Sequence, residues 1–233
     1  MPVSANDLTE LTLVAALAPD AAVAVATAVA ETAAAAAPTA RKRPRPGERR
    51  VQILQTLAAM LEQPGADRVT TAALAAKLDV SEAALYRHFA SKAQMFEGLI
   101  EFIEQSVFSL VNQITERETD YAVRTRKLVV MVLQFAEKNP GMTRVMVGDA
   151  LVFENDRLQE RMNQFFDKLE SNLKQSLRDA AAAGGAATPT VDAQVTASVV
   201  VAFMVGRLQR FARSGFKRLP SEHLEASLAT ILA

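Results

Sequence analysis

Residues 70–89 read TTAALAAKLDVSEAALYRHF, and the expected fold follows from this stretch. Its apolar side chains are spaced for two short helices that cross, and Ala75 leaves room for a close crossing. Asp79 stands in the tight turn where glycine is usual, because aspartate tolerates left-handed backbone geometry better than most residues. Ser81 is a suitable N-cap for the second helix. The pattern predicts a helix-turn-helix whose buried side chains are Leu74, Leu78, Val80, Leu85 and Phe89.

The second helix of this motif is placed to read the major groove of DNA. Its first residues, Glu82, Ala83 and Ala84, are expected on the exposed side, and its positive end is free to face phosphate or base edges. The next residues, 91–94, read Ser-Lys-Ala-Gln, which has the form of a capping box. We therefore expect another helix to begin there, with Lys92 positioned for a phosphate contact.

Helical spacing extends on both sides of the motif. Apolar residues recur at intervals of three and four from Glu48 until Pro64-Gly65. The predicted fold is all-α: an N-terminal three-helix domain that contains the helix-turn-helix, followed by a larger helical dimerisation body. The expected helices are 48–63, 71–78, 82–88, 92–115, 121–138, 142–151, 154–183, 190–214 and 221–232.

Two features of the body predict how it packs. Residues 128–136 are apolar nearly all round, which indicates a central helix surrounded by others. The two long helices on either side of Gly184-Gly185 are expected to form a hairpin, and two such hairpins from two chains make a four-helix interface. A homodimer is therefore expected.

Charge is unevenly distributed along a chain whose formal net charge is zero. Residues 41–92 hold ten basic and five acidic side chains, whereas residues 1–40 carry four acidic side chains and no basic one. Such asymmetry is typical of a segment that binds double-stranded DNA. The basic arm 41–47 and the nearby Arg49 and Arg50 are expected at phosphates or the minor groove; a solvated charged tail is the alternative.

The first 40 residues differ from the rest. They are mostly alanine, valine and threonine, which lack the bulk a core requires, so a disordered low-complexity tail is expected. Their first charges are acidic, unlike a signal peptide, and charges interrupt the apolar runs, so no membrane segment is expected. The predicted organisation is a tail at 1–40, the arm and DNA-binding domain at 41–92, and a dimerisation and partner-binding domain at 93–233.

The composition gives little support for an enzymatic function. The chain has no cysteine and only His88 and His223, and the common nucleophile, zinc and phosphate-loop motifs are absent. No catalytic residue, metal site or cofactor is expected. The lack of cysteine also suits a reducing cytoplasm.

Residues 69–75 and 80–92 resemble the N-terminal domain of TetR-type regulators, and residues 81–89, SEAALYRHF, have the narrower form found in nucleoid occlusion factors. The resemblance continues through residues 95–96, 99–104, 137–144 and 153–159, where TetR-type proteins otherwise diverge, and covers about residues 48–232. It implies a cytoplasmic, nucleoid-associated homodimer that binds palindromic chromosomal sites, with higher-order association on DNA as a further expectation, and that blocks assembly of the division protein FtsZ over the nucleoid.

The resemblance also implies two sets of site residues. In addition to Arg49 and Arg50, the DNA-facing positions are Thr70, Thr71, Ser81, Glu82, Ala84, Tyr86, Arg87 and Lys92. The FtsZ-facing positions are Phe102, Met131, Gln134, Lys138 and Asn139. This sequence departs from the family pattern at Gln134, where the family can carry glycine, and at Leu110, where it can carry arginine.

Simpler roles remain open for several of these residues. Phe102 lies off the apolar stripe of its helix, so it faces either a partner or another helix of its own chain. Lys138 and Asn139 precede Pro140, and helix termination alone accounts for them. A second functional hypothesis is a TetR-type transcriptional repressor controlled by a small-molecule effector, which requires an apolar pocket in the body.

Overall fold

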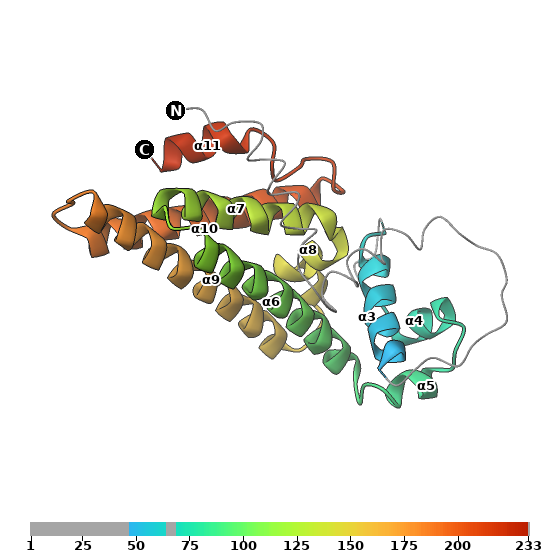
Figure 1. Cartoon of the computed structure of the whole chain (residues 1–233). Helices are drawn as coiled ribbons and strands as arrows, with labels where there is room; N and C mark the ends of the chain where they lie inside the picture. Colours follow the sequence, from blue (N-terminus) through green and yellow to red (C-terminus); the bar gives the residue numbers. More distant parts are fainter. Residues whose placement is uncertain (1–46, 64–68, 233) are drawn as a thin grey trace. The chain divides into compact units, whose positions relative to one another are not determined.

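The computed structural model describes residues 47–63 and 69–232, and within them helices are the regular secondary structure (Figure 1). The all-α prediction is confirmed. The predicted tail at 1–40 and most of the basic arm lie outside the described residues. The described chain divides into two compact units, one ending at Phe102 and the other beginning at Ile103.

The first unit holds the three predicted helices and the start of a fourth. These are α3 (Glu48–Leu61), α4 (Thr71–Lys77), α5 (Glu82–Tyr86) and α6 (Lys92–Arg117), and the division between the units falls inside α6. Its core includes Leu74, Leu85 and Phe89, as predicted. Leu78 and Val80, also predicted to be buried, are only partly so, because they flank the turn between α4 and α5 and not the helix crossing.

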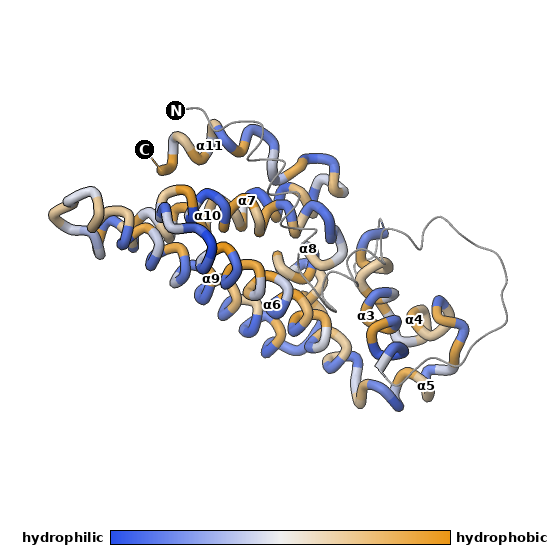
Figure 2. The backbone as a smooth tube through the Cα atoms, in the orientation of Figure 1, coloured by the Kyte–Doolittle hydropathy of each residue, from blue (hydrophilic) through white to orange (hydrophobic). Residues whose placement is uncertain are grey.

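The second unit contains the rest of α6 and the remaining helices, which are α7 (Tyr121–Lys138), α8 (Pro140–Met146), the short 3₁₀ helix η1 (Asp149–Leu151), α9 (Asp156–Ala183), α10 (Pro189–Arg213) and α11 (Leu224–Ile231). α9 and α10 form the predicted hairpin and pack along each other (Figure 1). Gly185, with φ 75°, makes the left-handed turn that ends α9. Figure 2 shows hydrophilic and hydrophobic residues alternating around α9, as expected for a helix with one buried face.

α7 is the central helix that its composition predicts. All six residues of 128–133 are buried, and α7 packs against both α9 and α10. The helix has no polar face along this stretch, so it is stable only when other helices surround it.

One helix was predicted at 142–151, but the structure has two shorter helices between Pro140 and Leu151, which are α8 and η1. Pro140 begins α8, because a proline in the first turn gives up no helical hydrogen bond and has the required φ. Gly148, with φ 82°, then ends α8 and separates it from η1. The buried Thr143 joins α8 to α7, since its hydroxyl donates to the Ala136 carbonyl at 2.8 Å.

Polar contacts fix the connection between α6 and α7. The Glu118 carboxylate accepts hydrogen bonds from Lys127 Nζ at 2.8 Å and from the Asp120 N–H at 3.0 Å. Partial burial raises the pKa of this carboxyl, but the bonds from Lys127 and Asp120 outweigh burial and hold the pKa below its usual value. The Arg124 guanidinium also donates to the Glu118 carbonyl. The connection is therefore held by the Glu118 side chain, which precedes it, and by the Arg124 and Lys127 side chains, which follow it.

α10 is long and apolar enough to cross a membrane by length and composition alone, a property that core helices of soluble proteins share. One face of it is buried in the second unit, through residues such as Val200, Met204 and Leu208. Other apolar residues of the helix are exposed, as described below.

Candidate DNA-binding site

The turn of the helix-turn-helix has the predicted backbone. Asp79 has φ 53°, so it adopts the left-handed conformation that glycine usually supplies at this position. Thr70 and Ser81 are the N-caps of α4 and α5: their hydroxyls accept from the Ala73 N–H at 3.1 Å and from the Ala84 N–H at 3.3 Å. The caps fix the direction in which both short helices begin.

A side-chain hydrogen bond ties the two helices of the motif together. The Thr71 hydroxyl donates to the Glu82 carboxylate at 2.6 Å. This contact joins the first residue of α4 to the first residue of α5 and orients the carboxylate at the start of the recognition helix. Both residues were predicted to face DNA from their family positions, and nothing in the sequence indicated that they contact each other.

Arg50 supports the motif from α3. Its guanidinium donates to the His88 carbonyl at 2.8 Å and lies over the Phe89 ring, 4.0 Å from the centroid. The side chain therefore closes the C-terminal end of α5 and covers a core phenylalanine. Arg49, by contrast, donates to Gln52 in its own helix.

The start of α6 follows the predicted capping box in part. The Ser91 hydroxyl accepts from the Gln94 N–H at 3.2 Å, as expected, but the Gln94 side chain accepts from the Ala90 N–H, one residue earlier than the motif requires. Lys92 is the first residue of α6, and its ammonium lies 5.6 Å from the centroid of the Phe96 ring. This contact positions a cation at the helix start.

The remaining DNA candidates are Ala84, Tyr86 and Arg87, all on or directly after α5. Tyr86 and Arg87 are exposed and Ala84 is partly exposed, so the first unit brings every DNA candidate onto one small domain. Lys77 is a further exposed cation, in the last turn of α4, that sequence reasoning did not select. Its charge alone was the available signal, and surface lysines are too common for that signal to discriminate.

The FtsZ candidates fall in both units. Phe102 is partly exposed and belongs to the first unit. In the second unit Lys138 is exposed and Gln134 partly so, while Met131 and Asn139 are each only 8% exposed. Asn139 donates from its side-chain amide to the Phe135 carbonyl at 2.7 Å, so it also closes the end of α7.

Two known protein families match the chain, one in each of its two units. Residues 53–99 match the family described as bacterial regulatory proteins of the tetR family, and residues 119–232 match the SlmA-like family described as tetracyclin repressor-like, C-terminal domain. The solved structure of PfmR, a TetR family regulator from Thermus thermophilus, aligns with a TM-score of 0.63 at 20% identity over 78% of this chain and 95% of that one. The fatty acid degradation regulator FadR from Bacillus halodurans aligns with a TM-score of 0.65 at 15% identity, over 82% and 97%. The fold and the helix-turn-helix thus define a TetR-type DNA-binding regulator.

Curated relatives are much more similar in sequence. The nucleoid occlusion factor SlmA of Aliivibrio fischeri strain MJ11 is 51% identical over 82% of this chain and 97% of its own length. SlmA of Idiomarina loihiensis is 51% identical over 76% of this chain and 90% of its own length. The chain belongs to this SlmA family of nucleoid occlusion factors. Its class is that of DNA-binding regulators, and it is not an enzyme.

Replacing Arg50 by alanine is expected to destabilise the DNA-binding unit by about 1 kcal/mol, because the hydrogen bond to His88 and the contact with Phe89 are both lost at an exposed position. Urea unfolding measures the change. Arg49→Ala is the matched control, since the Arg49 guanidinium donates to Gln52 within α3 and not to the helix-turn-helix among the described residues. Equal stability of the two variants would show that Arg50 does not support the motif.

Replacing Lys92 by alanine is expected to weaken DNA binding and to lower the dependence of log K on log salt by about one unit, because one phosphate contact is lost. The measurement is a titration of selected chromosomal fragments at several salt concentrations. Lys174→Ala removes the same charge from α9 and should leave the salt slope unchanged. An unchanged slope in the Lys92 variant would contradict its place at the DNA.

Proposed function

We propose that this protein is a nucleoid occlusion factor that binds specific palindromic chromosomal sites as a homodimer and, when bound, inhibits FtsZ ring assembly over the nucleoid. It acts in the cytoplasm, on the nucleoid. The observation that carries the proposal is the identity of about one half with SlmA proteins along nearly their whole length.

DNA recognition is supported by the geometry of the first unit. Two capped helices are joined by a left-handed turn at Asp79, Tyr86 and Arg87 are exposed at the end of α5, and Lys92 begins α6. A single unit of this size contacts one half-site, so a palindromic target requires two copies related by a two-fold axis.

Dimerisation is supported by an exposed apolar row on α10. Val191, Val195 and Val199 are 62%, 61% and 49% exposed, and each lies one helical turn after the last. Exposed valines in such a row mark a surface that another protein covers. The hairpin of α9 and α10 is long enough to supply one half of a four-helix interface.

Replacing Val195 by glutamate is expected to convert the dimer to a monomer at micromolar concentration, because a charge would be buried in an apolar interface. Sedimentation equilibrium measures the mass. Val152→Glu is the control: Val152 is 70% exposed but lies after η1, outside the α10 row. A wild-type mass of one chain would refute the dimer itself.

FtsZ inhibition is tested by assembly of FtsZ with GTP, followed by light scattering and sedimentation. The protein is added alone and together with chromosomal fragments selected for binding. We expect assembly to fall, to fall further with bound DNA, and to recover in Phe102→Ala. Phe153→Ala removes a more exposed phenylalanine elsewhere on the chain and should still inhibit.

Tight DNA binding without any effect on FtsZ would contradict this proposal and leave a transcriptional repressor. Inhibition that is equal in the Phe102 and Phe153 variants would retain the function but remove Phe102 from the partner surface.

A further inference from the structure

The segment that follows α10, residues 214–223, has an unusual backbone. Gly215 and Phe216 have φ values of 63° and 64°, and His223 has φ 54°. A left-handed conformation is unfavourable for residues with a bulky side chain, and it persists only where surrounding contacts maintain it. One such contact is the packing of the Phe216 ring on the Phe211 ring, with 5.2 Å between the centroids.

Hydrogen bonds from α7 and α10 hold the same segment. The Glu137 carboxylate, near the end of α7, accepts from the Ser221 N–H at 2.6 Å. The Arg207 guanidinium, on α10, donates to the Glu222 carbonyl at 2.7 Å and to the Ser227 hydroxyl at 2.9 Å. The segment is therefore fixed in place although its backbone is strained.

The backbone that carries two cations of this segment is fixed as well. The Ser214 hydroxyl accepts from the Lys217 N–H at 3.1 Å and from the Arg218 N–H at 2.9 Å. Both side chains are exposed, so their charged ends are in solvent while their backbone is held.

An open hollow lies between α10 and this segment. Its volume is about 830 Å³, which suits a small molecule, because sites for such ligands have volumes of roughly 300–1,000 Å³. Its apolar lining consists of Ala202, Phe203 and Gly206, and a Cβ atom built on Gly206 would meet nothing within 4 Å. All of the lining residues belong to α10 and to residues 217–223, so the hollow is on the outside of the bundle.

The cationic side of the hollow lies beside the exposed valine row of α10 and not on it. In a helix with 3.6 residues per turn, Phe203, Arg207 and Arg210 are roughly 60–120° around the axis from the mean direction of that row. A ligand can therefore reach the cations from the flank of α10.

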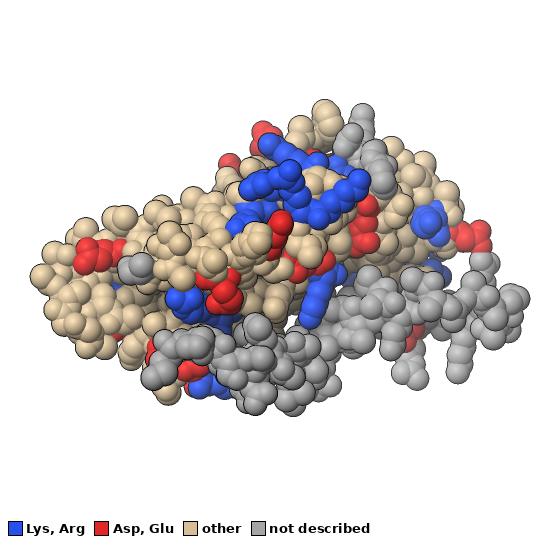
Figure 3. Space-filling model, turned by 90° about the horizontal axis from the view of Figure 1, so that it is seen from above, with Lys and Arg blue, Asp and Glu red and all other residues tan. Residues whose placement is uncertain are grey.

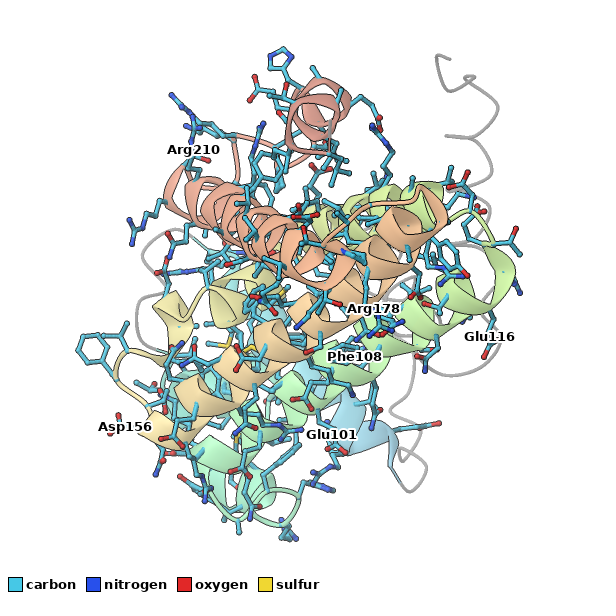
Figure 4. The ribbon with its side chains drawn as sticks, turned by 90° about the vertical axis from the view of Figure 1, so that its left-hand side faces the viewer. Glu101, Phe108, Glu116, Asp156, Arg178 and Arg210 are labelled. Atoms are coloured by element: carbon cyan, nitrogen blue, oxygen red, sulfur yellow. The ribbon has the colours of Figure 1, made fainter. Side chains whose placement is uncertain are left out.

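The rim of the hollow is strongly basic. Lys and Arg side chains gather over the C-terminal part of α10 and the following segment (Figure 3), and Arg210 lies on the outer side of α10 (Figure 4). The lining cations are Arg207, Arg210, Lys217 and Arg218, whereas Glu222 is the acidic residue of the lining. Within residues 47–63 and 69–232, no acidic side chain lies at ion-pair distance from Arg210, Lys217 or Arg218. These three charges are available to an anion.

We infer that the hollow binds a nucleoside polyphosphate, with its phosphates against Arg210, Lys217 and Arg218 and its base against the apolar lining. Guanidinium and ammonium groups bind phosphate oxygens through charge-assisted hydrogen bonds. A base can stack on an aromatic ring or on a guanidinium plane, and the Arg207 guanidinium lies over the Phe203 ring, 4.9 Å from the centroid. This site is separate from the positions expected at DNA and FtsZ, and the inference does not rest on the proposed function.

A nucleotide suits the hollow better than other phosphate compounds do. Inorganic phosphate would use the cations but leave the apolar lining in water. The bases of duplex DNA are stacked inside the helix and cannot reach that lining. A nucleoside polyphosphate has both a compact group of charges and a free base, so it uses both parts of the site.

The test is the binding of a nucleoside triphosphate that carries a fluorescent group on its ribose, followed by anisotropy at about 0.15 M salt. The titration is made on the free protein and on protein with a selected chromosomal fragment bound, which occupies the cations of the helix-turn-helix. We expect saturable binding of one nucleotide per chain in both cases. Arg210→Ala and Lys217→Ala should each raise the Kd about tenfold, because each removes a charge-assisted hydrogen bond.

Arg213→Ala is the matched control. Arg213 is exposed in the same last turn of α10 but does not line the hollow, so this variant should bind the nucleotide like the wild type. Inorganic triphosphate, which has no base to stack, should bind about tenfold more weakly than the nucleotide. Helical circular dichroism should be unchanged in all three variants, since each replaced side chain is exposed.

Absence of saturable nucleotide binding would overturn the inference. Equal losses in all three variants would do the same, because they would indicate a general attraction to the basic surface. Inorganic triphosphate that binds as tightly as the nucleotide would remove the base from the site. Binding of vesicles of anionic phospholipid through Arg210 and Lys217, without binding of the nucleotide, would assign these cations to a membrane surface instead.

Discussion

The burial of α7 on all sides is the constraint on which the second unit depends. Residues 128–133 offer no polar face, so helices of the same chain must enclose them. α9 and α10 do so, and each contributes one apolar face to the enclosure. The ends of α7 are then fixed by polar contacts, with Asp120 capping its start and Asn139 closing its end. Because α7 is buried along its apolar stretch and held at both ends, it cannot slide along α9 and α10 without losing these contacts.

The first unit is stabilised differently, because it is too small to have a large core. α4 and α5 have only seven and five residues, and helices of that length are unstable alone. Their stability comes from caps at Thr70 and Ser81, from the Thr71–Glu82 contact, and from packing of Leu74, Leu85 and Phe89. Arg50 adds a contact from α3. Several residues that are expected to contact DNA thus also stabilise the motif. A variant of one of them can lose DNA affinity because the motif is less stable, so its stability has to be measured as well.

α10 connects the core of the second unit with the proposed interface. One face is buried in the second unit, whereas Val191, Val195 and Val199 are exposed on the other.

Much of this protein was determined by local sequence. The helix-turn-helix, the left-handed Asp79, the caps and the central position of 128–136 follow from residues within one or two turns of each other, because backbone propensity and hydrophobic period act over that range. The partial exposure of Val80 and the pairing of Thr71 with Glu82 did not follow, since both depend on which elements pack nearby. The open space beside Gly206 is the clearest case. The sequence shows a glycine in an apolar helix, but only the tertiary structure places the segment 217–223 opposite it, because long-range packing decides which side of a helix is covered and which is left open.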